Sequence, residues 1–535
     1  MNALDRLISN LAPRIALRRA LARQALSHLG RTKGLSVRRY EAATNSRRTR
    51  GWIAGSTSSN SETYLSLAKL RDRSRDLVRN NCWASIAVSL IDSDAVGTGM
   101  VPKATHEDET AVELAEQLWA QWGETTECDA DGRHDFYGLQ SLCVREMVEA
   151  GEVLVRRRWR KAEDGLSLPL QLQVLEGDYI DSTRDEVLTG SGGKESGRIV
   201  QGIEFGPFGK RVAYWLFAEH PGDRRSGLSE SLRIPAYEVI HLYRSDRAGQ
   251  VRGVPWGASC LMRMRDFDEY EDATLLRRKI ANSFAMFITR PEGPEGIGAV
   301  VSSSGEKEPP PVEDLEPGTV KHLGAGEEVQ FSNPPNSEDY PDYAQVSLRA
   351  IAAGFGVTYE GLSGDLSRVN FASGRMGWLS YQRRVAQWQS KILLPGLCAP
   401  VWRWFTEAAS ISRGFDPDVG ARWTPPHREF IDPRAEVEGI KAAIRAGIMT
   451  RSEACLALGR DPDEVLAELA RDLEAARDAG VFLDIDPAAD LGRKNGPLAS
   501  PSDPANVAKP GGMPAKMPAK MPAKMPAGMD DAEDE

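Results

Sequence analysis

Polar and charged side chains gather between Tyr359 and Arg384, in the stretch YEGLSGDLSRVNFASGRMGWLSYQRR. Glycine, serine and aspartate at this density could build a catalytic turn. The segment GLSGD (361–365) is similar to the Gly-x-Ser-x-Gly motif that carries a catalytic serine, but the spacing of its glycines differs. In addition, a helix is predicted before it, whereas the motif requires a strand there. Ser363 also lacks a histidine that any motif marks as its base. The pattern therefore predicts no catalytic residue here.

Arginine side chains in the same stretch point to phosphate contact instead. Arg368 lies in the Gly/Ser-rich part, and Arg375 lies on the helix predicted to follow. A guanidinium group donates two parallel hydrogen bonds to a phosphate, and Asn370 could donate another. Ordinary salt bridging between helices or subunits is the alternative, and residue types alone favour it.

Other segments that imitate functional motifs fail on spacing or context. GTGMVPK (97–103) lacks the Gly-Lys-Ser/Thr ending of a phosphate loop and follows a predicted helix. The seven histidines form no close pair, and no Cys/His cluster is present. We therefore expect no transition-metal site and no cofactor.

A run of acidic side chains on one predicted helix keeps an enzymatic alternative open. The run consists of Asp266, Asp268, Glu269, Glu271 and Asp272. Two-metal nucleases use carboxylates, but usually from separate elements that converge in a cleft. Five acids within one short helical segment point in many directions, which favours a solvated or lumen-facing helix. The alternative is a metal-dependent DNA-processing enzyme that uses residues 266–272.

Length and composition indicate a large protein with several domains. The 535 residues predict two to four domains, and hydrophobic residues make up 41%. No apolar run is long enough to cross a bilayer, and arginines interrupt the first thirty residues where a secretory signal would be apolar. Six singly spaced cysteines predict reduced thiols without a disulfide framework.

Charge is distributed unevenly along the chain. Residues 1–50 hold twelve Lys/Arg and two Asp/Glu, although the formal net charge of the whole chain is −10. Three interpretations of this basic arm stay open: a poorly ordered segment, an arm that binds nucleic acid or a partner, and a mitochondrial transit peptide. The acidic remainder would not grip DNA over its full surface, but it could line a conduit through which DNA slides.

Hydrophobic periodicity predicts helices, then strands, then helices again. Helical spacing runs from Leu67 to the glycines at 97 and 99, and period-two alternation begins at Glu152. Further helices are expected at 109–122, 136–150, 257–290, 339–354 and from about 372 to a stop at Pro395. Residues 291–317 read as a loop and 319–331 as a hairpin around Gly-Ala-Gly. Thr450 and Asp461 look like helix N-caps, and the repeats from Met513 predict a disordered tail.

The order of these elements resembles the lambda-type portal proteins of tailed bacteriophages and prophages. Four blocks carry the resemblance, at 73–104, 202–223, 234–256 and 348–384. The last is the most specific, because aromatic-Glu-x-Leu-Ser followed by Asn-aromatic-Ala/Ser-Ser-x-Arg is uncommon elsewhere. The resemblance extends over roughly residues 35–475. The tail repeats from Met513 have no counterpart in the shared part of the family. The N-terminal start is variable in the family, whose members can lose an N-terminal segment to a head-maturation protease.

The resemblance implies an α+β portal fold that assembles into a ring. Its parts would be a β-rich wing, two antiparallel stem helices, a clip hairpin, a long kinked helix and an α-helical crown. The implied boundaries are a basic N-terminal arm (1–50), the wing (51–256), stem helix 1 (257–290), the clip (291–335), stem helix 2 (336–355), the tunnel-loop region (356–373), the long helix and return to the wing (374–433), the crown (434–485) and a disordered tail (486–535).

The function implied by the resemblance is structural and not enzymatic. The ring, of twelve subunits, would occupy one capsid vertex and conduct double-stranded DNA without sequence specificity. Its partners would be the large terminase subunit, the head-tail connector, the major capsid protein and the scaffold, with no membrane. The protein would reside in the virion and, during assembly, in the host cytoplasm. A soluble scaffold or adaptor of another kind remains a third option.

Three groups of residues are candidates for these roles. Those for the DNA channel are Arg368, Asn370, Arg375 and Asp365; those for docking of terminase or connector at the clip are Lys321, His322, Glu327 and Glu328; those for pairing between subunits along the stem are Asp268, Asp272, Arg277 and Arg278.

Overall fold

The computed structural model divides the chain into two units, Met1–Pro426 and His427–Glu535. It describes residues 42, 47–189, 195–223, 230–282, 286–289, 328–331, 340–426 and 430–479. The basic arm up to residue 41 and the tail beyond residue 479 lie outside the described residues. No described helix is both long enough and apolar enough to cross a bilayer.

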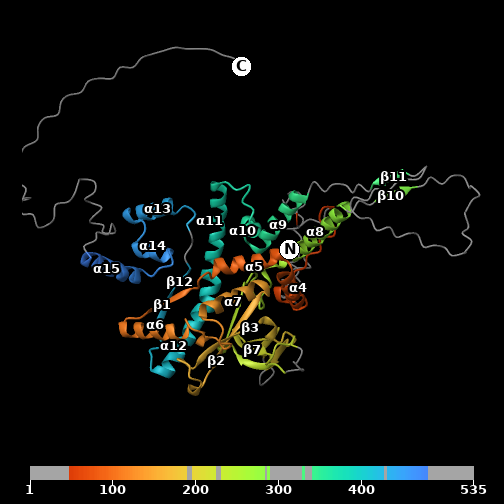
Figure 1. Cartoon of the computed structure of the whole chain (residues 1–535). Helices are drawn as coiled ribbons and strands as arrows, with labels where there is room; N and C mark the ends of the chain where they lie inside the picture. The colour runs from red at the N-terminus through yellow and green to blue at the C-terminus, as the bar shows by residue number, and fades with distance from the viewer. Residues whose placement is uncertain are drawn as a thin grey trace, which may run out of the picture. The chain divides into compact units, whose positions relative to one another are not determined.

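Helices form the first part of unit 1 (Figure 1). They are α3 (Ser59–Tyr64), α4 (Leu67–Asn80), α5 (Cys82–Ala95), α6 (Glu109–Trp122) and α7 (Phe136–Glu149). The single helix expected from Leu67 onward is wrong, because it breaks at Asn81. The Asn81 side chain accepts hydrogen bonds from the backbone N–H groups of Trp83 and Ala84, which caps α5 as a separate helix.

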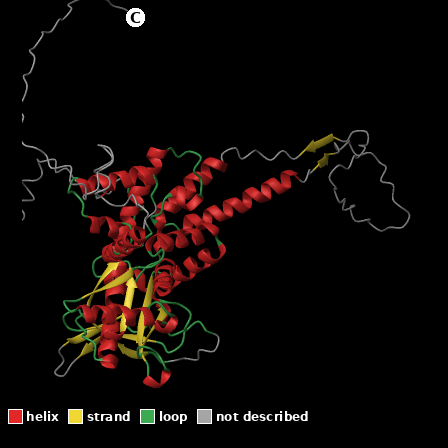
Figure 2. Cartoon of the chain, turned by 60° about the vertical axis from the view of Figure 1, so that its left-hand side comes forward, coloured by secondary structure: helices red, strands yellow, loops and turns green. Residues whose placement is uncertain are grey.

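Two antiparallel sheets follow, within the region from Glu152 onward where alternation predicted strands (Figure 2). A three-stranded sheet has the order β3-β2-β9, and a five-stranded sheet has the order β4-β5-β6-β7-β8. The strands are β2 (Glu152–Trp159), β3 (Leu170–Glu176), β4 (Glu186–Thr189), β5 (Glu195–Val200), β6 (Ile203–Phe205), β7 (Arg211–Leu216), β8 (Leu232–Pro235) and β9 (Val239–Tyr243). Short 3-10 turns lie at Thr126–Cys128, Ala162–Asp164, Gly177–Tyr179, Ala236–Glu238 and Trp256–Ser259.

After the sheets, the chain runs outward through one long helix and returns through a second helix that lies antiparallel to the first. These are α8 (Leu261–Asn282) and α9 (Tyr340–Phe355). Tyr270 contacts Tyr343 at a ring-centroid distance of 4.4 Å, and further along α8 the Arg278 guanidinium lies over the Tyr340 ring. At the other end, the ring of Phe355 lies directly against Gly257. These contacts show that α8 and α9 run in opposite directions along each other.

The predicted continuation of the first of these helices to residue 290 is wrong. Residues 286–289 form strand β10 (Met286–Thr289), which pairs with β11 (Glu328–Phe331) in the register Met286↔Phe331. The aromatic and β-branched residues Phe287, Ile288 and Thr289 favour a strand over a helix. The second strand of the expected 319–331 hairpin thus pairs with β10. Its other predicted strand lies outside the described residues.

A continuous helical rod follows, and the predicted stop at Pro395 is also wrong. Helix α11 (Phe371–Trp388) runs through a π-helical segment, η8 (Gln389–Cys398), into α12 (Ala399–Arg413). The wider π turn relieves the clash that a proline ring makes with the preceding turn of an α-helix. After the rod, β12 (Gly420–Thr424) pairs antiparallel with β1 (Val101–Thr105), which returns the chain to the first helices.

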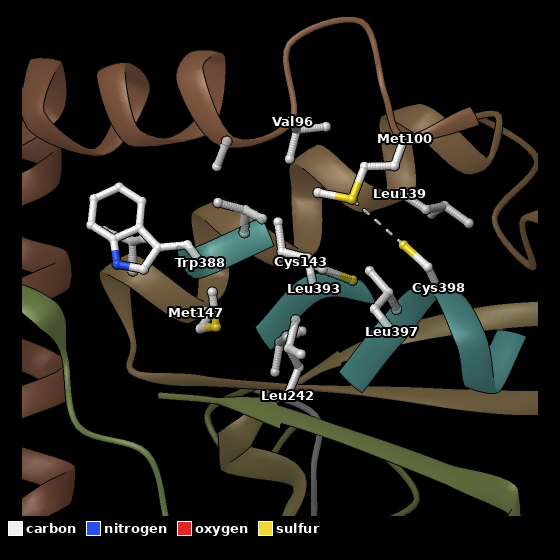
Figure 3. Packing of buried hydrophobic residues seen from close by; sticks show 14 of the residues in the cluster. Val96, Met100, Leu139, Cys143, Met147, Leu242, Trp388, Leu393, Leu397 and Cys398 are labelled. Atoms are coloured by element: carbon white, nitrogen blue, oxygen red, sulfur yellow. Dashed lines mark hydrogen bonds between the residues drawn. The ribbon is translucent and has the colours of Figure 1, made fainter. Parts of the chain in front are cut away.

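The core of unit 1 packs the rod between the helices and the three-stranded sheet (Figure 3). Cys398 and Met100 contact each other at 3.9 Å between their sulfur atoms, and Cys143 is fully buried beside them. Burial raises the pKa of the Cys143 and Cys398 thiols, so both stay protonated and behave as small apolar side chains. All six cysteines are free thiols.

A buried carboxylate joins the helices to both sheets. Glu152, the first residue of β2, is completely buried and contacts Arg71 at 2.6 Å and Arg252 at 2.5 Å. It also bonds to His241 Nε2 at 3.0 Å and accepts from the Gly253 N–H at 2.8 Å. Burial alone would raise the pKa of Glu152, but Arg252, His241 and Arg71 together hold it well below the ordinary value.

Unit 2 contains three short helices in its described part. They are α13 (Pro433–Arg445), α14 (Arg451–Ala457) and α15 (Pro462–Asp478). Both predicted N-caps are confirmed. Thr450 accepts from the Glu453 N–H at 3.1 Å while the Glu453 carboxylate accepts from the Thr450 N–H at 2.8 Å. Asp461 accepts from the Asp463 N–H at 2.7 Å, with Pro462 at the first helical position.

We predict that Glu152→Gln strongly destabilises unit 1. The substitution leaves the buried guanidinium group of Arg252 without a counter-charge and leaves Arg71 with Asp178 alone, which should lower the free energy of unfolding by about 3–5 kcal/mol. Denaturant unfolding followed by tryptophan fluorescence measures the change. Glu269→Gln removes an exposed ion pair with Arg265 and is the matched control, expected to leave the midpoint nearly unchanged. Equal effects of the two variants would contradict the assigned importance of Glu152.

We also predict that unit 1 loses stability as the pH falls from 6.5 towards 4. Burial lowers the pKa of His241 to about 4, despite its bond to Glu152, so the unfolded chain takes up a proton at a pH where the folded chain does not. This difference amounts to about 3 kcal/mol across the interval. Chemical denaturation between pH 7 and 5 should show a shallower pH dependence for His241→Gln than for the wild type.

Candidate functional site

The segment between α9 and α11, which the sequence analysis singled out, is mostly a turn with one short helix. Helix α10 (Tyr359–Ser363) begins at Thr358, whose hydroxyl accepts from the Gly361 N–H at 3.1 Å. It ends at Gly364, whose φ of 68° lies in the left-handed region that glycine adopts without strain. Ser363 donates to the carbonyl of Tyr359 at 2.8 Å, which is a local bond without catalytic meaning.

Asp365 and Arg368 have different surroundings in this turn. The Asp365 carboxylate accepts from the hydroxyl and N–H of Ser367 at 2.6 and 3.0 Å and from the Tyr359 hydroxyl at 2.9 Å. These hydrogen bonds, led by the Ser367 hydroxyl, lower the pKa of Asp365. Arg368 donates to the Gln345 side chain on α9 at 3.1 Å and is otherwise exposed. Asp365 therefore shapes the turn, whereas Arg368 keeps most of its donors towards the surface.

The first part of α11 carries the other two channel candidates. Asn370 is the N-cap, and its Oδ1 accepts from the Ser373 N–H at 2.8 Å while the Ser373 hydroxyl accepts from the Asn370 N–H at 3.2 Å. The amide oxygen is therefore committed to the helix, and only its Nδ2 could reach a phosphate. Arg375 is exposed, and residues 371–380 include no buried side chain.

The candidates for pairing along α8 divide into two kinds. Asp268 accepts from Asn81 Nδ2 at 3.1 Å, and Arg278 lies over Tyr340 at 5.5 Å. Both thus have partners inside the chain, which the sequence could not show. Asp272 and Arg277 are exposed. Of the clip candidates, Lys321, His322 and Glu327 lie outside the described residues, and Glu328 is described only as the first residue of β11.

The acidic run of α8 has no catalytic geometry among the described residues. Glu269 pairs with Arg265 at 2.8 Å, and Glu271 accepts from the Tyr340 hydroxyl at 2.9 Å. Within the described part of the chain, no group of three metal-ligand atoms includes any of these acids. The geometry therefore gives no support to the metal-dependent alternative.

One cluster that sequence reasoning missed does contain possible ligand atoms. Those of Glu176, Asp178 and His220 lie within 4.8 Å of one another. However, Arg75 contacts the Glu176 carboxylate and lies 2.8 Å from Asp178, and Arg71 lies 3.0 Å from Asp178, so both acids already have guanidinium partners. Burial raises the pKa of the neighbouring Glu146 to about 7, against the effect of Arg75. The cluster is an ion-pair network between α4, α7 and the end of β3, and no sequence motif announced it.

An open pocket of about 760 Å³ lies where β9, the end of α9 and the rod meet. Its wall contains Arg244, Arg384 and Lys391, and Arg384 donates to the Gly356 carbonyl at 2.9 Å. His241 and Ser245 also line the pocket, but both His241 nitrogens face partners, Glu152 and Arg211. His241 therefore cannot serve Ser245 as a base, and the pocket offers no nucleophile–base pair.

Comparison with known proteins identifies the family. A sequence-family model described as "Phage portal protein, lambda family" matches residues 45–389. The probable portal protein of Halomonas phage phiHAP-1 is 25% identical over 472 residues, covering 83% of this chain and 88% of the relative. Portal protein B of Escherichia phage lambda is 23% identical over 487 residues, covering 81% and 88%.

Solved structures give weaker likenesses. The neck of an empty GTA particle computed with C6 symmetry covers 78% of this chain and 98% of its own, at 15% identity and a TM-score of 0.41. An HK97 family phage portal protein from Corynebacterium diphtheriae covers 72% and 99%, at 12% identity and a TM-score of 0.29.

The mixed helix-and-sheet fold and the named relatives define a phage structural protein of the portal class. Because the family match spans well over half of the 535 residues, the chain belongs to the lambda family of phage portal proteins.

We predict that Asn370→Ala frays the start of α11. Loss of an N-cap side chain costs about 1 kcal/mol of helix stability, because the first N–H groups lose their acceptor. Hydrogen exchange of residues 371–374 should accelerate several-fold. Ser380→Ala, at an exposed position within the same helix, is the control and should leave exchange unchanged. Unchanged exchange in Asn370→Ala would show that tertiary contacts and not the cap hold this end.

Proposed function

We propose that this chain forms a dodecameric ring at one capsid vertex, through which double-stranded DNA is packaged and ejected. The family match over residues 45–389 is the observation that carries the proposal. In this proposal α8 and α9 belong to the stem, residues 51–256 are the wing and residues 434–485, within unit 2, are the crown. The ring acts as a conduit and performs no chemical step.

Surface features of the stem support association between copies. Leu275 and Leu276 on α8 and Val346 on α9 are more than half exposed, which is unfavourable for an isolated chain. Asp272 and Arg277, also exposed, have opposite charges and could pair with neighbours. A closed ring requires that each copy present two different faces to its neighbours. The two sides of the α8–α9 pair would supply such faces.

The charge of the chain suits passage of DNA without tight binding. A subunit with a formal net charge of −10, repeated around a ring, repels the phosphate backbone. Sparse cations such as Arg368 and Arg375 can then add weak contacts that slow backward movement without reading sequence. We assign Asp365 and Asn370 to shaping the turn that presents these arginines.

Partners follow from the same assignment. The segment around Lys321, His322, Glu327 and Glu328 would dock the large terminase subunit during packaging and the head-tail connector afterwards. The wing would meet the major capsid protein and the scaffold. The protein would assemble in the host cytoplasm and remain at the portal vertex of the virion.

Electron microscopy of the purified full chain tests the central claim, because the proposal requires rings with a central channel. Particles without a channel, or a monomer at high concentration, would refute it.

We predict that Arg368→Ala leaves the ring intact and shortens the DNA retained in filled heads. The substitution removes an exposed cation from the turn, together with its bond to Gln345. Gel sizing of DNA from purified heads measures the effect, and electron microscopy verifies the ring. Arg413→Ala, at the far end of the rod, is the matched control. Normal retention by Arg368→Ala would remove the proposed role.

A further inference from the structure

Unit 2 lacks a core of its own in the part that the structure describes. Of residues 430–479, only Ala454 is buried. Helices α14 and α15 pack on each other, yet their apolar side chains stay partly exposed. A helical unit of this size rarely buries enough apolar surface to fold alone, and oligomerisation is a common remedy.

Helix α13 presents an apolar stripe that the described chain covers only in part. Val437, Ile440, Ile444 and Ile448 recur at three- and four-residue intervals, which places them along one face. Val437 is 51% exposed and Ile448 81% exposed. Ile448 follows Gly447, whose φ of 70° ends the helix, and its N–H bonds to the Ala443 carbonyl. The stripe is therefore held in a defined conformation and not in a frayed end.

Helix α15 presents a second stripe with complementary charge. Leu466, Leu469 and Leu473 recur at intervals of three and four, and Leu466 is 54% exposed. Helix α15 contains six acidic and two basic residues, whereas α13 contains three basic and two acidic residues. Two copies of α15 would repel each other, but α13 of one copy and α15 of another attract.

We propose that the α13 stripe of one copy packs against the α15 stripe of a second copy of this chain. The contact joins two different faces, so it repeats around a closed ring without self-pairing. It completes a core that each copy supplies only in part, which makes folding of unit 2 depend on assembly. The inference rests on the ring proposed above and names an interface within it.

Co-expression of two single-cysteine versions of the full chain tests this pairing. Cys82→Ser and Cys455→Ser first remove the exposed and the half-buried thiol, and the other four cysteines are buried. Val437→Cys is then placed in one version and Leu466→Cys in another of different mass. After mild oxidation, mixed rings should give the 437–466 heterodimer several-fold above either homodimer. Glu438→Cys in place of Val437→Cys, one residue off the stripe, should lose this product.

Three outcomes would overturn the inference, and microscopy of the same sample separates them from failure of the ring. In rings with a normal channel, absence of the 437–466 product would show that another surface covers the stripe, while the portal function stands. Dominant homodimers would show self-pairing. An internal disulfide in a chain that carries both cysteines would show that the two stripes meet within one copy. A sample without rings would refute the proposed function itself, and the inference with it.

Discussion

The Glu152 carboxylate is the constraint on which the arrangement of unit 1 depends. An ionised carboxylate without access to water is strongly unfavourable unless cations and hydrogen-bond donors surround it. Arg71 comes from α4, His241 from β9 and Arg252 from the loop that leads towards α8, so these three elements must converge on the start of β2. Arg252 also donates to the carbonyls of Gln201 and Gly177, which ties the five-stranded sheet to the same point. The bonds to the Glu152 carboxylate and to Arg252 therefore fix the positions of the helices and of both sheets relative to one another.

The two exposed helices take their direction from this junction. A Cβ atom at Gly253 would lie 2.1 Å from the Gly151 carbonyl oxygen, so the backbone beside Glu152 is packed closely enough to demand glycine. A few residues further on, Trp256 packs on Trp388 of the rod at 4.9 Å. The ring of Phe355 at the end of α9 fits against Gly257. Helix α8 therefore starts, and α9 ends, on a rigid base formed by the ionic core and the rod. Unfolding of the Glu152 network and the rod by heat or denaturant would therefore change the direction of α8 and α9 together.

Local signals were sufficient for the features that depend on local energetics. Alternation along residues 152–159 coincides with β2, the helix at 109–122 coincides with α6, and the N-caps at Thr450 and Asp461 rest on hydrogen bonds within three residues.

Errors occurred where distant contacts outweigh local preference. Pro395 stays within a helix because the rod packs tightly against β9, where a Cβ at Gly396 would lie 2.7 Å from Leu242. Strand β11 pairs with β10 across some forty residues. The partners of Glu152 lie up to a hundred residues away, and no spacing rule relates them. In the candidate channel segment, residue types alone did not distinguish the four candidates, and only the structure separates Asp365 and Asn370, which shape the turn, from Arg368 and Arg375, which remain exposed.

The two units differ in where their stability originates, and this difference suits a ring. Unit 1 has an extensive apolar core together with the Glu152 network, so its fold is specified within one chain. Unit 2 has one buried side chain in its described part and two exposed stripes, so its fold gains from whatever covers them. Binding that selects the folded state stabilises it in proportion to the logarithm of partner concentration, and neighbours in a ring are held at a very high effective concentration. A single chain can thus reach the site of assembly with unit 1 already formed. In the ring proposed above, completion of unit 2 by its neighbour would favour closed rings over partial ones, because only a closed ring would leave no stripe uncovered.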